Sequence, residues 1–210
     1  MKTVAIILAR GGSEGIPKKN IIDLNGKPLL SYTIEASNKS MVNETWVSTN
    51  CPEIKQCAYD HGAFVLDRPN EISGDKSKSE EALLDFASQI EFDVLVFIQP
   101  TSPLLKASDI NNGLNMIKDY DSVFSAYQEH WLPRWTIENA PHQWDTNNRP
   151  MRQDMPEHFV ENGAFYITTK ECLLKSGLRY SGKIGIYEMP IERSFQIDTL
   201  DDLELIKRLL

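Results

Sequence analysis

The regular alternation of short apolar runs with amphipathic segments constrains the fold of this sequence more than any other feature. Runs rich in β-branched and aromatic residues, typical of strands, lie at residues 3–9, 45–49, 63–67, 93–98 and 122–127. Segments with apolar residues at helical spacing lie between them, at residues 28–40, 51–62, 79–90 and 109–120. The first run is apolar on both faces, as in a buried parallel strand. The pattern predicts an α/β fold with a mostly parallel sheet flanked by helices on both faces.

The alternation is interrupted once and then resumes, with strands predicted at residues 163–168 and 184–189 and helices at 169–177 and 201–210. The interruption contains Trp131, Trp135, Trp144 and four prolines. It is too irregular for a strand–helix unit and too aromatic for a disordered linker. We therefore predict a single domain over residues 1–210 with an insertion at about 128–160, packed on the sheet edge or on a partner subunit.

Residues with known capping preferences predict where several helices begin and end. Proline favours the first helical position, which we assign to Pro28. The hydroxyls of Ser79 and Thr199 can accept a hydrogen bond from the first turn of a helix, so both are predicted N-caps. Gly62 is predicted to end the helix before it.

The overall charge excludes one broad class of function. The chain has 210 residues, and its 30 acidic against 22 basic side chains give a formal net charge of −8. Nucleic-acid binders need a basic face, so we expect no nucleic-acid partner. Three cysteines without a C-x-x-C pair favour a reduced, cytoplasmic setting. No run predicts a signal peptide or a membrane span.

The loop after the first strand, "LARGGSEGIPKKN" at residues 8–20, predicts a phosphate site. Ligands collect at the carboxyl ends of strands in open α/β sheets. Adjacent glycines let backbone N–H groups approach an anion, and the nearby arginine and lysines add positive charge. The loop matches neither a P-loop nor a dinucleotide fingerprint. A glycine-rich turn with solvated lysines explains the loop equally well.

Seven sequence blocks, in order, resemble those of the acylneuraminate cytidylyltransferases, the CMP-sialic acid synthetases. They are "ILARGGSEGIPKKNI", "WVSTN", "QPTSPL", "YDSVFS", "RPMRQD", "ENGAFYI" and "YEMPIERSFQIDTLDDL". The resemblance covers nearly the whole chain. It implies a fold similar to the nucleotide-diphospho-sugar transferases. It also implies a homodimer built partly by the insertion, with Trp131, Trp135 and Phe159 packing across the interface.

The resemblance further implies that the protein joins CTP to a nine-carbon 2-keto acid sugar and releases pyrophosphate. The acceptor would be N-acetylneuraminate or a bacterial relative such as legionaminate or pseudaminate. Two alternatives stay open from the sequence. One is transfer to an eight-carbon keto acid sugar, and the other is a non-catalytic protein that binds a nucleotide sugar.

Site residues carried over from the resemblance fall into two groups. The nucleotide group contains a triphosphate cradle, a nucleoside contact at Asn20, and two cytosine contacts at Arg68 and Ser79. The cradle consists of Arg10, Gly11, Gly12, Ser13 and Lys19. The proposed catalytic residues are Arg10, Lys19 and Asp198. Without the resemblance, Arg68 would be interpreted as an ordinary surface arginine and not as a ligand-binding residue.

The sugar group comes from three blocks, each of which has a structural explanation as well. The members are Gln99, Thr101, Ser102, Arg149, Arg152, Gln153, Glu161 and Asn162. Short polar groups suit sugar hydroxyls, and guanidinium groups suit a carboxylate. The alternatives are a turn after a strand, a solvated basic loop, and a turn in which Gly163 has an unusual backbone conformation.

Two positions depart from the family pattern. Glu14 replaces a lysine in the phosphate loop, so Lys18 or Lys19 is expected to take part of that role unless Glu14 faces solvent. The family's metal-binding aspartate pair is represented by Gln196 and Asp198. An amide offers one neutral oxygen, so a divalent cation, Mg²⁺ or Mn²⁺, should bind this site weakly without CTP.

Overall fold

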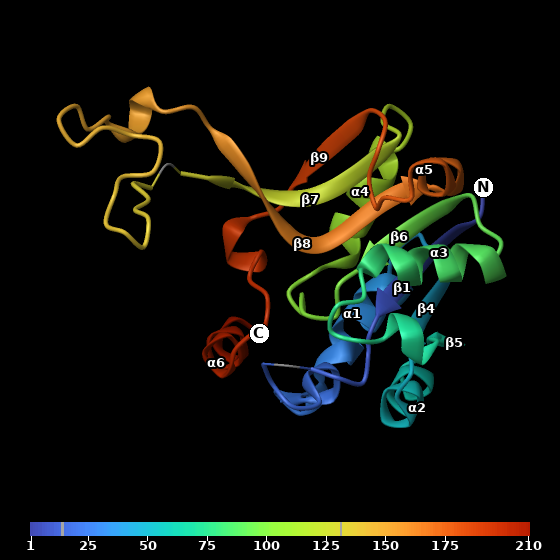
Figure 1. Cartoon of the computed structure of the whole chain (residues 1–210). Coiled ribbons are helices and arrows are strands. Elements are labelled where there is room, and N and C mark those ends of the chain that lie inside the picture. Colours follow the sequence, from blue (N-terminus) through green and yellow to red (C-terminus); the bar gives the residue numbers. More distant parts are fainter. Residues whose placement is uncertain (14, 131) are drawn as a thin grey trace.

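The structure is a computed structural model that describes residues 1–13, 15–130 and 132–210. Among these residues, seven strands form one sheet in the spatial order β5-β4-β1-β6-β8-β7-β9 (Figure 1). Their bounds are β1 (Thr3–Leu8), β4 (Glu44–Thr49), β5 (Phe64–Asp67), β6 (Val94–Ile98), β7 (Ser122–Glu129), β8 (His158–Thr169) and β9 (Ile184–Glu188). The short strands β2 (Asp23–Leu24) and β3 (Lys27–Pro28) form a separate hairpin.

Most neighbouring strands are parallel, as predicted. β1 pairs in parallel with β4 and β6, β4 with β5, and β7 with β9. β8 is the exception, because it runs antiparallel to both β6 and β7. No crossover helix lies in the described chain between β7 and β8, so the two strands can pair in opposite directions. β8 is also longer than the strand predicted at residues 163–168.

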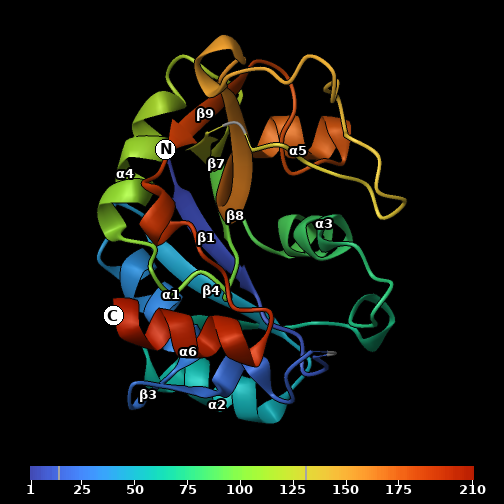
Figure 2. The ribbon, with the colours of Figure 1, turned by 90° about the vertical axis from the view of Figure 1, so that its left-hand side faces the viewer.

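Helices cover both faces of the sheet (Figure 2). Their bounds are α1 (Leu29–Asn38), α2 (Pro52–Asp60), α3 (Ser79–Gln89), α4 (Ala107–Met116), α5 (Lys170–Ser176) and α6 (Leu200–Leu209). Helices α1, α2 and α4 lie on one face, and α3 and α5 on the other. Helix α6 packs against α1 and the β2–β3 hairpin through a third apolar cluster. Within the described ranges, no helix combines the length and apolar character needed to span a bilayer.

The residues of β1 show why this strand lies in the interior of the sheet. Successive side chains point to opposite faces, and Ile7 packs toward Ile34 of α1 while Ile6 packs toward Phe86 of α3. All four side chains are fully buried. Burying one such side chain stabilises the fold by about 1.5 to 3 kcal/mol. Because β1 lies between β4 and β6 and runs parallel to both, the loop that follows β1 lies among the carboxyl ends of these strands.

The predicted N-cap at Ser79 is wrong. Ser79 is the first residue of α3, and Lys78 occupies the N-cap position. The side chain of Glu81 caps this end instead, because its Oε2 accepts a hydrogen bond from the backbone N–H of Lys78 at 3.1 Å. The hydroxyl of Ser79 is therefore not needed to cap the helix.

The other predicted helix ends are partly confirmed. Pro28 lies at the N-cap of α1, one residue before the first helical position that we predicted for it. Thr199 is the N-cap of α6, as predicted, and its Oγ1 accepts a hydrogen bond from the N–H of Asp202 at 3.2 Å. Gly62 follows the end of α2 with a φ of 78°, a conformation that glycine adopts at little cost.

The described residues between β7 and β8, residue 130 and residues 132–157, form an arm that projects away from the sheet (Figure 1). The arm contains one short 3₁₀ helix, η3 (Arg152–Asp154), in its described residues. Its packing is local: the rings of Trp135 and Trp144 meet edge to face, with their centroids 5.0 Å apart. The arm does not lie along its own sheet edge, which was one of the two packings expected for the insertion. Trp131, expected at a dimer interface, lies outside the described residues.

Candidate active site

A cavity of about 620 Å³ opens at the carboxyl ends of β1 and β6. Most of the nucleotide residues predicted from sequence meet here with the proposed metal residues and part of the sugar group. The predicted residues that line it are Arg10, Gly12, Ser13, Lys19, Asn20, Ser79, Gln99, Thr101, Gln196 and Asp198. The cavity therefore brings together residues from the beginning and the end of the sequence.

Gly11 contributes to the loop in a different way from that predicted. It is absent from the lining of the cavity, and its N–H donates to Oδ1 of Asn50 at 2.9 Å. A Cβ atom at this position would lie 2.9 Å from the Cβ of Cys51. A side chain at Gly11 would therefore push the loop away from the turn between β4 and α2.

Gly15 is a residue of the cavity that we did not identify from the sequence. It lines the cavity, and a Cβ atom there would lie 2.8 Å from the backbone oxygen of Asp198. Glycine thus allows the first loop to approach the segment before α6. The third glycine of "GGSEG" is the signal that could have pointed to this contact. Glu14, the departure discussed above, lies outside the described residues.

The basic residues of the loop point in different directions. Lys19 Nζ forms an ion pair with Oδ1 of Asp198 at 2.8 Å inside the cavity, whereas Lys18 Nζ pairs with Glu53 on α2 at 2.8 Å. Arg10 forms an ion pair with Asp75. Lys19 therefore lines the cavity, whereas Lys18 does not.

Asn20 stabilises the shape of the loop. Its side chain is buried, and its Nδ2 donates to the backbone oxygen of Arg10 at 3.0 Å. This hydrogen bond closes the loop between the end of β1 and the 3₁₀ helix η1 (Lys19–Ile21). Asn20 also lines the cavity.

Arg68 is not an ordinary surface arginine. The residue is only 8% exposed and lines a smaller cavity of about 140 Å³, which shares Leu8, Arg10 and Ser79 with the main cavity. Its Nε donates to Oγ of Ser48 at 3.1 Å, and its Nη2 to the Ser48 backbone oxygen at 3.2 Å. Among the described residues, no carboxylate forms an ion pair with it.

Burial affects the charge of Arg68. Loss of hydration, followed by repulsion from Arg10, lowers its pKa to about 10. The guanidinium therefore remains protonated at neutral pH. A buried cation without a carboxylate partner is costly unless hydrogen bonds or a ligand compensate it. This environment favours a ligand with oxygen or nitrogen acceptors in the smaller cavity.

A further part of the cavity lining comes from residues 99–101, 196 and 198. Gln99 and Thr101 line the cavity, whereas Ser102, the next residue in the chain, is buried and is not part of the lining. The amide of Gln196 donates through Nε2 to the backbone oxygen of Asn162 at 2.5 Å and to Gln99 Oε1 at 3.1 Å. The contact with a backbone carbonyl fixes the orientation of this amide. Only Oε1 of Gln196 could then serve as a metal ligand.

The acidic groups present suit a divalent cation only together with a substrate. Among the described residues, no group of three or more His, Cys, Asp or Glu side chains could hold a metal ion. Asp198, with 68% of its side chain exposed, supplies one carboxylate at the cavity. Mg²⁺ is often held by one or two carboxylates plus substrate phosphates. The residues therefore fit a cation that arrives with a triphosphate.

The Cytidylyltransferase family model matches residues 4–210. This chain belongs to the cytidylyltransferase family. It is 41% identical over 204 residues to N-acylneuraminate cytidylyltransferase B of Danio rerio, covering 92% of this chain and 48% of that protein. It is 32% identical over 224 residues to a pseudaminic acid cytidylyltransferase of Campylobacter jejuni, covering 99% of this chain and 95% of that protein. These matches confirm the resemblance found in the sequence blocks.

The comparison of structures confirms the fold of this cytidylyltransferase family member. CMP:2-keto-3-deoxy-manno-octonic acid synthetase complexed with CTP matches with a TM-score of 0.76 and 20% identity, covering 100% of this chain and 98% of that one. The bifunctional IspDF of Campylobacter jejuni matches with a TM-score of 0.71 and 15% identity, covering 97% and 54%. The chain spans about half the length of the N-acylneuraminate cytidylyltransferases that it matches.

Two further predicted sugar residues of this cytidylyltransferase family member lie outside the cavity lining, as Ser102 does. Asn162 is buried, where its Oδ1 accepts from Ser125 Oγ at 2.6 Å and its Nδ2 donates to Ser194 Oγ at 2.9 Å. Glu161 accepts hydrogen bonds from the hydroxyls of Tyr166 and Tyr180 at 3.0 and 3.1 Å. Gly163, next to them, has a φ of 68°, which is the unusual backbone conformation offered above as an alternative.

The remaining sugar candidates of this family member lie on the arm. Arg152 and Gln153 line a separate cavity of about 630 Å³, and the guanidinium of Arg149 lies 5.8 Å from the ring centroid of Trp144. All three side chains are exposed. Within one chain, the structure does not bring them to the main cavity.

Proposed function

We propose that this protein transfers a cytidylyl group from CTP to a nine-carbon 2-keto acid sugar. The observation that carries the proposal is the meeting of the cationic loop, with Arg10 and Lys19, and Asp198 around one cavity. Two relatives that support it are named as an N-acylneuraminate cytidylyltransferase and a pseudaminic acid cytidylyltransferase. In the reaction, the anomeric hydroxyl oxygen bonds to the α-phosphorus, the proton of this hydroxyl passes to solvent, and the bond between the α-phosphorus and the oxygen of the leaving pyrophosphate breaks.

The two adjoining cavities suggest how CTP is held. We place the cytosine in the smaller cavity, where Arg68 can donate to the O2 or N3 acceptors of the base and Ser79 can offer its hydroxyl. The triphosphate would then lie along the main cavity against Arg10, Ser13 and Lys19. Guanidinium, ammonium and backbone N–H groups are suitable partners for its charge.

We propose Mg²⁺ or Mn²⁺ as the cofactor, held by Asp198 and by Oε1 of Gln196. When bound, the cation supplies neutralisation of the charge that develops on the phosphates. Lys19 forms an ion pair with Asp198 in this structure. Binding of the triphosphate would transfer Lys19 to phosphate oxygens and release the carboxylate for the cation.

We also propose that the protein acts as a homodimer in the cytoplasm. The described part of the arm exposes Leu132, Trp135 and Ile137, the last with 97% of its surface accessible. Exposed apolar clusters of this kind are typical of protein interfaces. A second copy would cover them, and it could bring Arg149 and Arg152 to the sugar side of a neighbouring cavity. The three cysteines are free thiols, which suits a reducing compartment.

Pyrophosphate release tests this function. The protein is incubated with Mg²⁺, each nucleoside triphosphate in turn, and a panel of eight- and nine-carbon keto acid sugars. We expect turnover with CTP and a nine-carbon acid. Turnover with only an eight-carbon acid would contradict the acceptor class. A rise in melting temperature with CTP but no pyrophosphate from any sugar would contradict catalysis altogether.

A further inference from the structure

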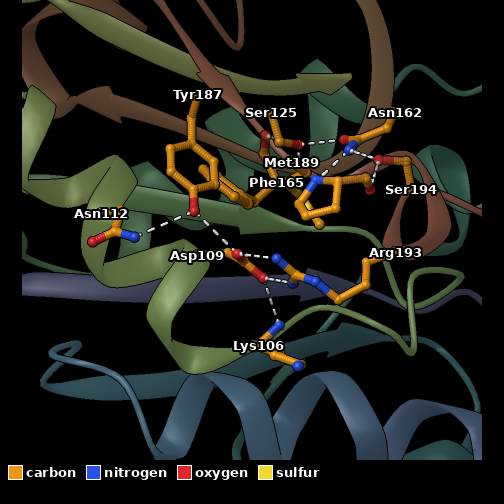
Figure 3. A network of polar contacts seen from close by, with 11 residues as sticks. Lys106, Asp109, Asn112, Ser125, Asn162, Phe165, Tyr187, Met189, Arg193 and Ser194 are labelled. Carbon is orange, nitrogen blue, oxygen red and sulfur yellow. Dashed lines mark hydrogen bonds and ion pairs between the residues drawn. The ribbon is translucent and has the colours of Figure 1, made fainter. Parts of the chain in front are cut away.

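The segment that carries Gln196 and Asp198 to the cavity belongs neither to a strand nor to an α-helix. It follows β9, begins with the 3₁₀ helix η4 (Ile191–Arg193), and ends at Thr199, where α6 is capped. Its position must therefore be maintained by tertiary contacts. Figure 3 shows the contacts at its start, where Arg193 reaches Asp109 on α4.

Asp109 is a buried carboxylate whose oxygens are both engaged. The residue is 1% exposed. Its Oδ1 accepts from Arg193 Nη2 at 2.9 Å and from the hydroxyl of Tyr187 at 3.1 Å. Its Oδ2 accepts from the backbone N–H of Lys106 at 2.9 Å and pairs with Arg193 Nη1. Breaking a buried pair of this kind leaves an uncompensated charge, so the pair holds Arg193 firmly in place.

The other end of the segment is attached to the same stretch of chain. The N–H of Ile197 donates to the backbone oxygen of Thr101 at 3.0 Å, and the side chain of Ile197 is fully buried. Thr101 lines the cavity, and Asp109 lies eight residues farther along, on α4. The two attachments therefore hold the segment that carries Gln196 and Asp198 against the stretch of chain that begins at Gln99 and continues into α4.

A third contact fixes the middle of the segment. Ser194 Oγ accepts from Nδ2 of Asn162, and the Asn162 backbone oxygen accepts from Gln196. Asn162 is buried in β8 and so cannot follow a displaced segment easily. Loss of the Arg193 attachment would leave the segment held only at these later points, with freedom to rotate at its start.

We propose that Asp109 and Arg193 form a positioning pair, which sets where Gln196 and Asp198 lie relative to the loop at residues 99–102. This inference rests on the proposed function. Neither residue lines the cavity, so the pair acts through the segment and not on the substrate. Partners that orient metal ligands typically change metal affinity or activity by about 10- to 100-fold when they are replaced.

The test compares three variants with the wild-type chain. Asp109→Asn keeps an oxygen for the N–H of Lys106 but removes the charge, and Arg193→Gln removes the opposite charge. Arg193→Lys keeps the charge and loses the paired donors. We measure the affinity for CTP by calorimetry, once with Mn²⁺ and once with EDTA. The ratio of these two affinities measures how much the contact between the protein and the cation contributes to binding. We also measure kcat with the nine-carbon acid.

We expect the affinity ratio and kcat to fall about tenfold or more in Asp109→Asn and Arg193→Gln. The affinity for CTP in EDTA should stay within about twofold, and Arg193→Lys should recover part of both losses. Leu173→Ala is the control, because Leu173 is fully buried in the apolar cluster on the opposite face of the sheet. It should lower the melting temperature and leave the ratio and kcat unchanged.

Several outcomes would overturn the inference or separate it from the proposed function. If the Asp109 and Arg193 variants lose only thermal stability, as Leu173→Ala does, the pair is merely structural. If Asp109→Asn and Arg193→Gln do not fold, the inference is overturned by an Arg193→Lys variant whose melting temperature falls, which shows a weakened pair, while its affinity ratio and kcat stay unchanged. A wild-type chain without turnover contradicts the proposed function, whereas the affinity ratio still tests the positioning of the segment.

Discussion

The amide of Gln196 and the carboxylate of Asp198 lie at the same cavity but differ in how firmly they are held. Gln196 is held through Nε2 by the Asn162 carbonyl and by Gln99. Asp198 is mostly exposed and is paired with Lys19. The first side chain is fixed by its hydrogen bonds, while the second can change partners when a ligand arrives. This contrast predicts different consequences for substitutions at the two positions.

Asp198→Asn should lower kcat by at least about 100-fold, because it replaces the only carboxylate that we assign to the cation. The stability of the fold should change by less than about 0.5 kcal/mol, since the side chain is exposed. Steady-state kinetics and thermal unfolding measure the two effects. Asp201→Asn, in the first turn of α6, is the matched control. Comparable kcat values for the two variants would remove Asp198 from the reaction.

Gln196→Asp should lower the Mg²⁺ concentration for half-maximal rate on the order of tenfold, because it adds a second carboxylate near the phosphates. The same change removes the hydrogen bond to the Asn162 carbonyl. Gln196→Asn is the control, because the asparagine side chain has the same length as the aspartate side chain and carries no charge. A magnesium titration of both variants separates the charge from the lost contact. Identical titrations would refute the proposed ligand role.

At the scale of elements, the N-terminus of α6 supports the site. The Thr199 hydroxyl accepts from Asp202, while the Asp202 carboxylate accepts from the N–H groups of Thr199 and Asp198 at 2.8 and 3.1 Å. The reciprocal contacts form a capping box. They extend one residue before the helix, to Asp198 itself. The cap therefore orders the backbone that presents the carboxylate to the cavity.

Thr199→Ala should destabilise the fold by about 1 kcal/mol, the usual effect of losing an N-cap hydroxyl. It should also raise the Mg²⁺ requirement, because the backbone at Asp198 becomes less ordered. Urea unfolding and a magnesium titration provide the measurements. Thr199→Ser keeps the hydroxyl and should behave like the wild-type chain. Equal stability of the alanine and serine variants would show that the cap contributes nothing.

At the scale of the whole molecule, the arm is separated from the cavity that the rest of the chain builds. The sheet gathers most of the residues that we propose to bind the nucleotide and the metal, whereas Arg149, Arg152 and Gln153 remain on the arm (Figure 1). Apolar side chains are exposed beside them on the described part of the arm. Association of two copies would explain both features together.

Trp135→Ser combined with Ile137→Asp should convert the proposed dimer to a monomer, as measured by light scattering. The KM for the sugar should rise, while the affinity for CTP should change little. Leu174→Ser, which alters an exposed apolar residue on α5, is the control. A wild-type chain with the mass of one copy would contradict the proposed dimer directly.

The sequence alone was sufficient for those features that depend on neighbouring residues. The buried run of β1, the loop after it, and the N-cap at Thr199 are local patterns of hydrophobicity, glycine and hydroxyl groups. The family also follows from ordered sequence blocks. Local pattern misplaced the cap of α3, because the hydroxyl of Ser79 and the carboxylate of Glu81 compete for the same end of the helix.

Only the tertiary structure decided which side chains act together. Asp109 and Arg193 are 84 residues apart in the chain, and neither carries a local signal that names its partner. The sequence also does not show that the N–H of Gly11 donates to the side chain of Asn50. Nor does it show that Gly15 lies so close to the backbone oxygen of Asp198 that a side chain would not fit. Hydrogen bonds and steric contacts depend on distances in space, and folding alone brings distant segments within those distances.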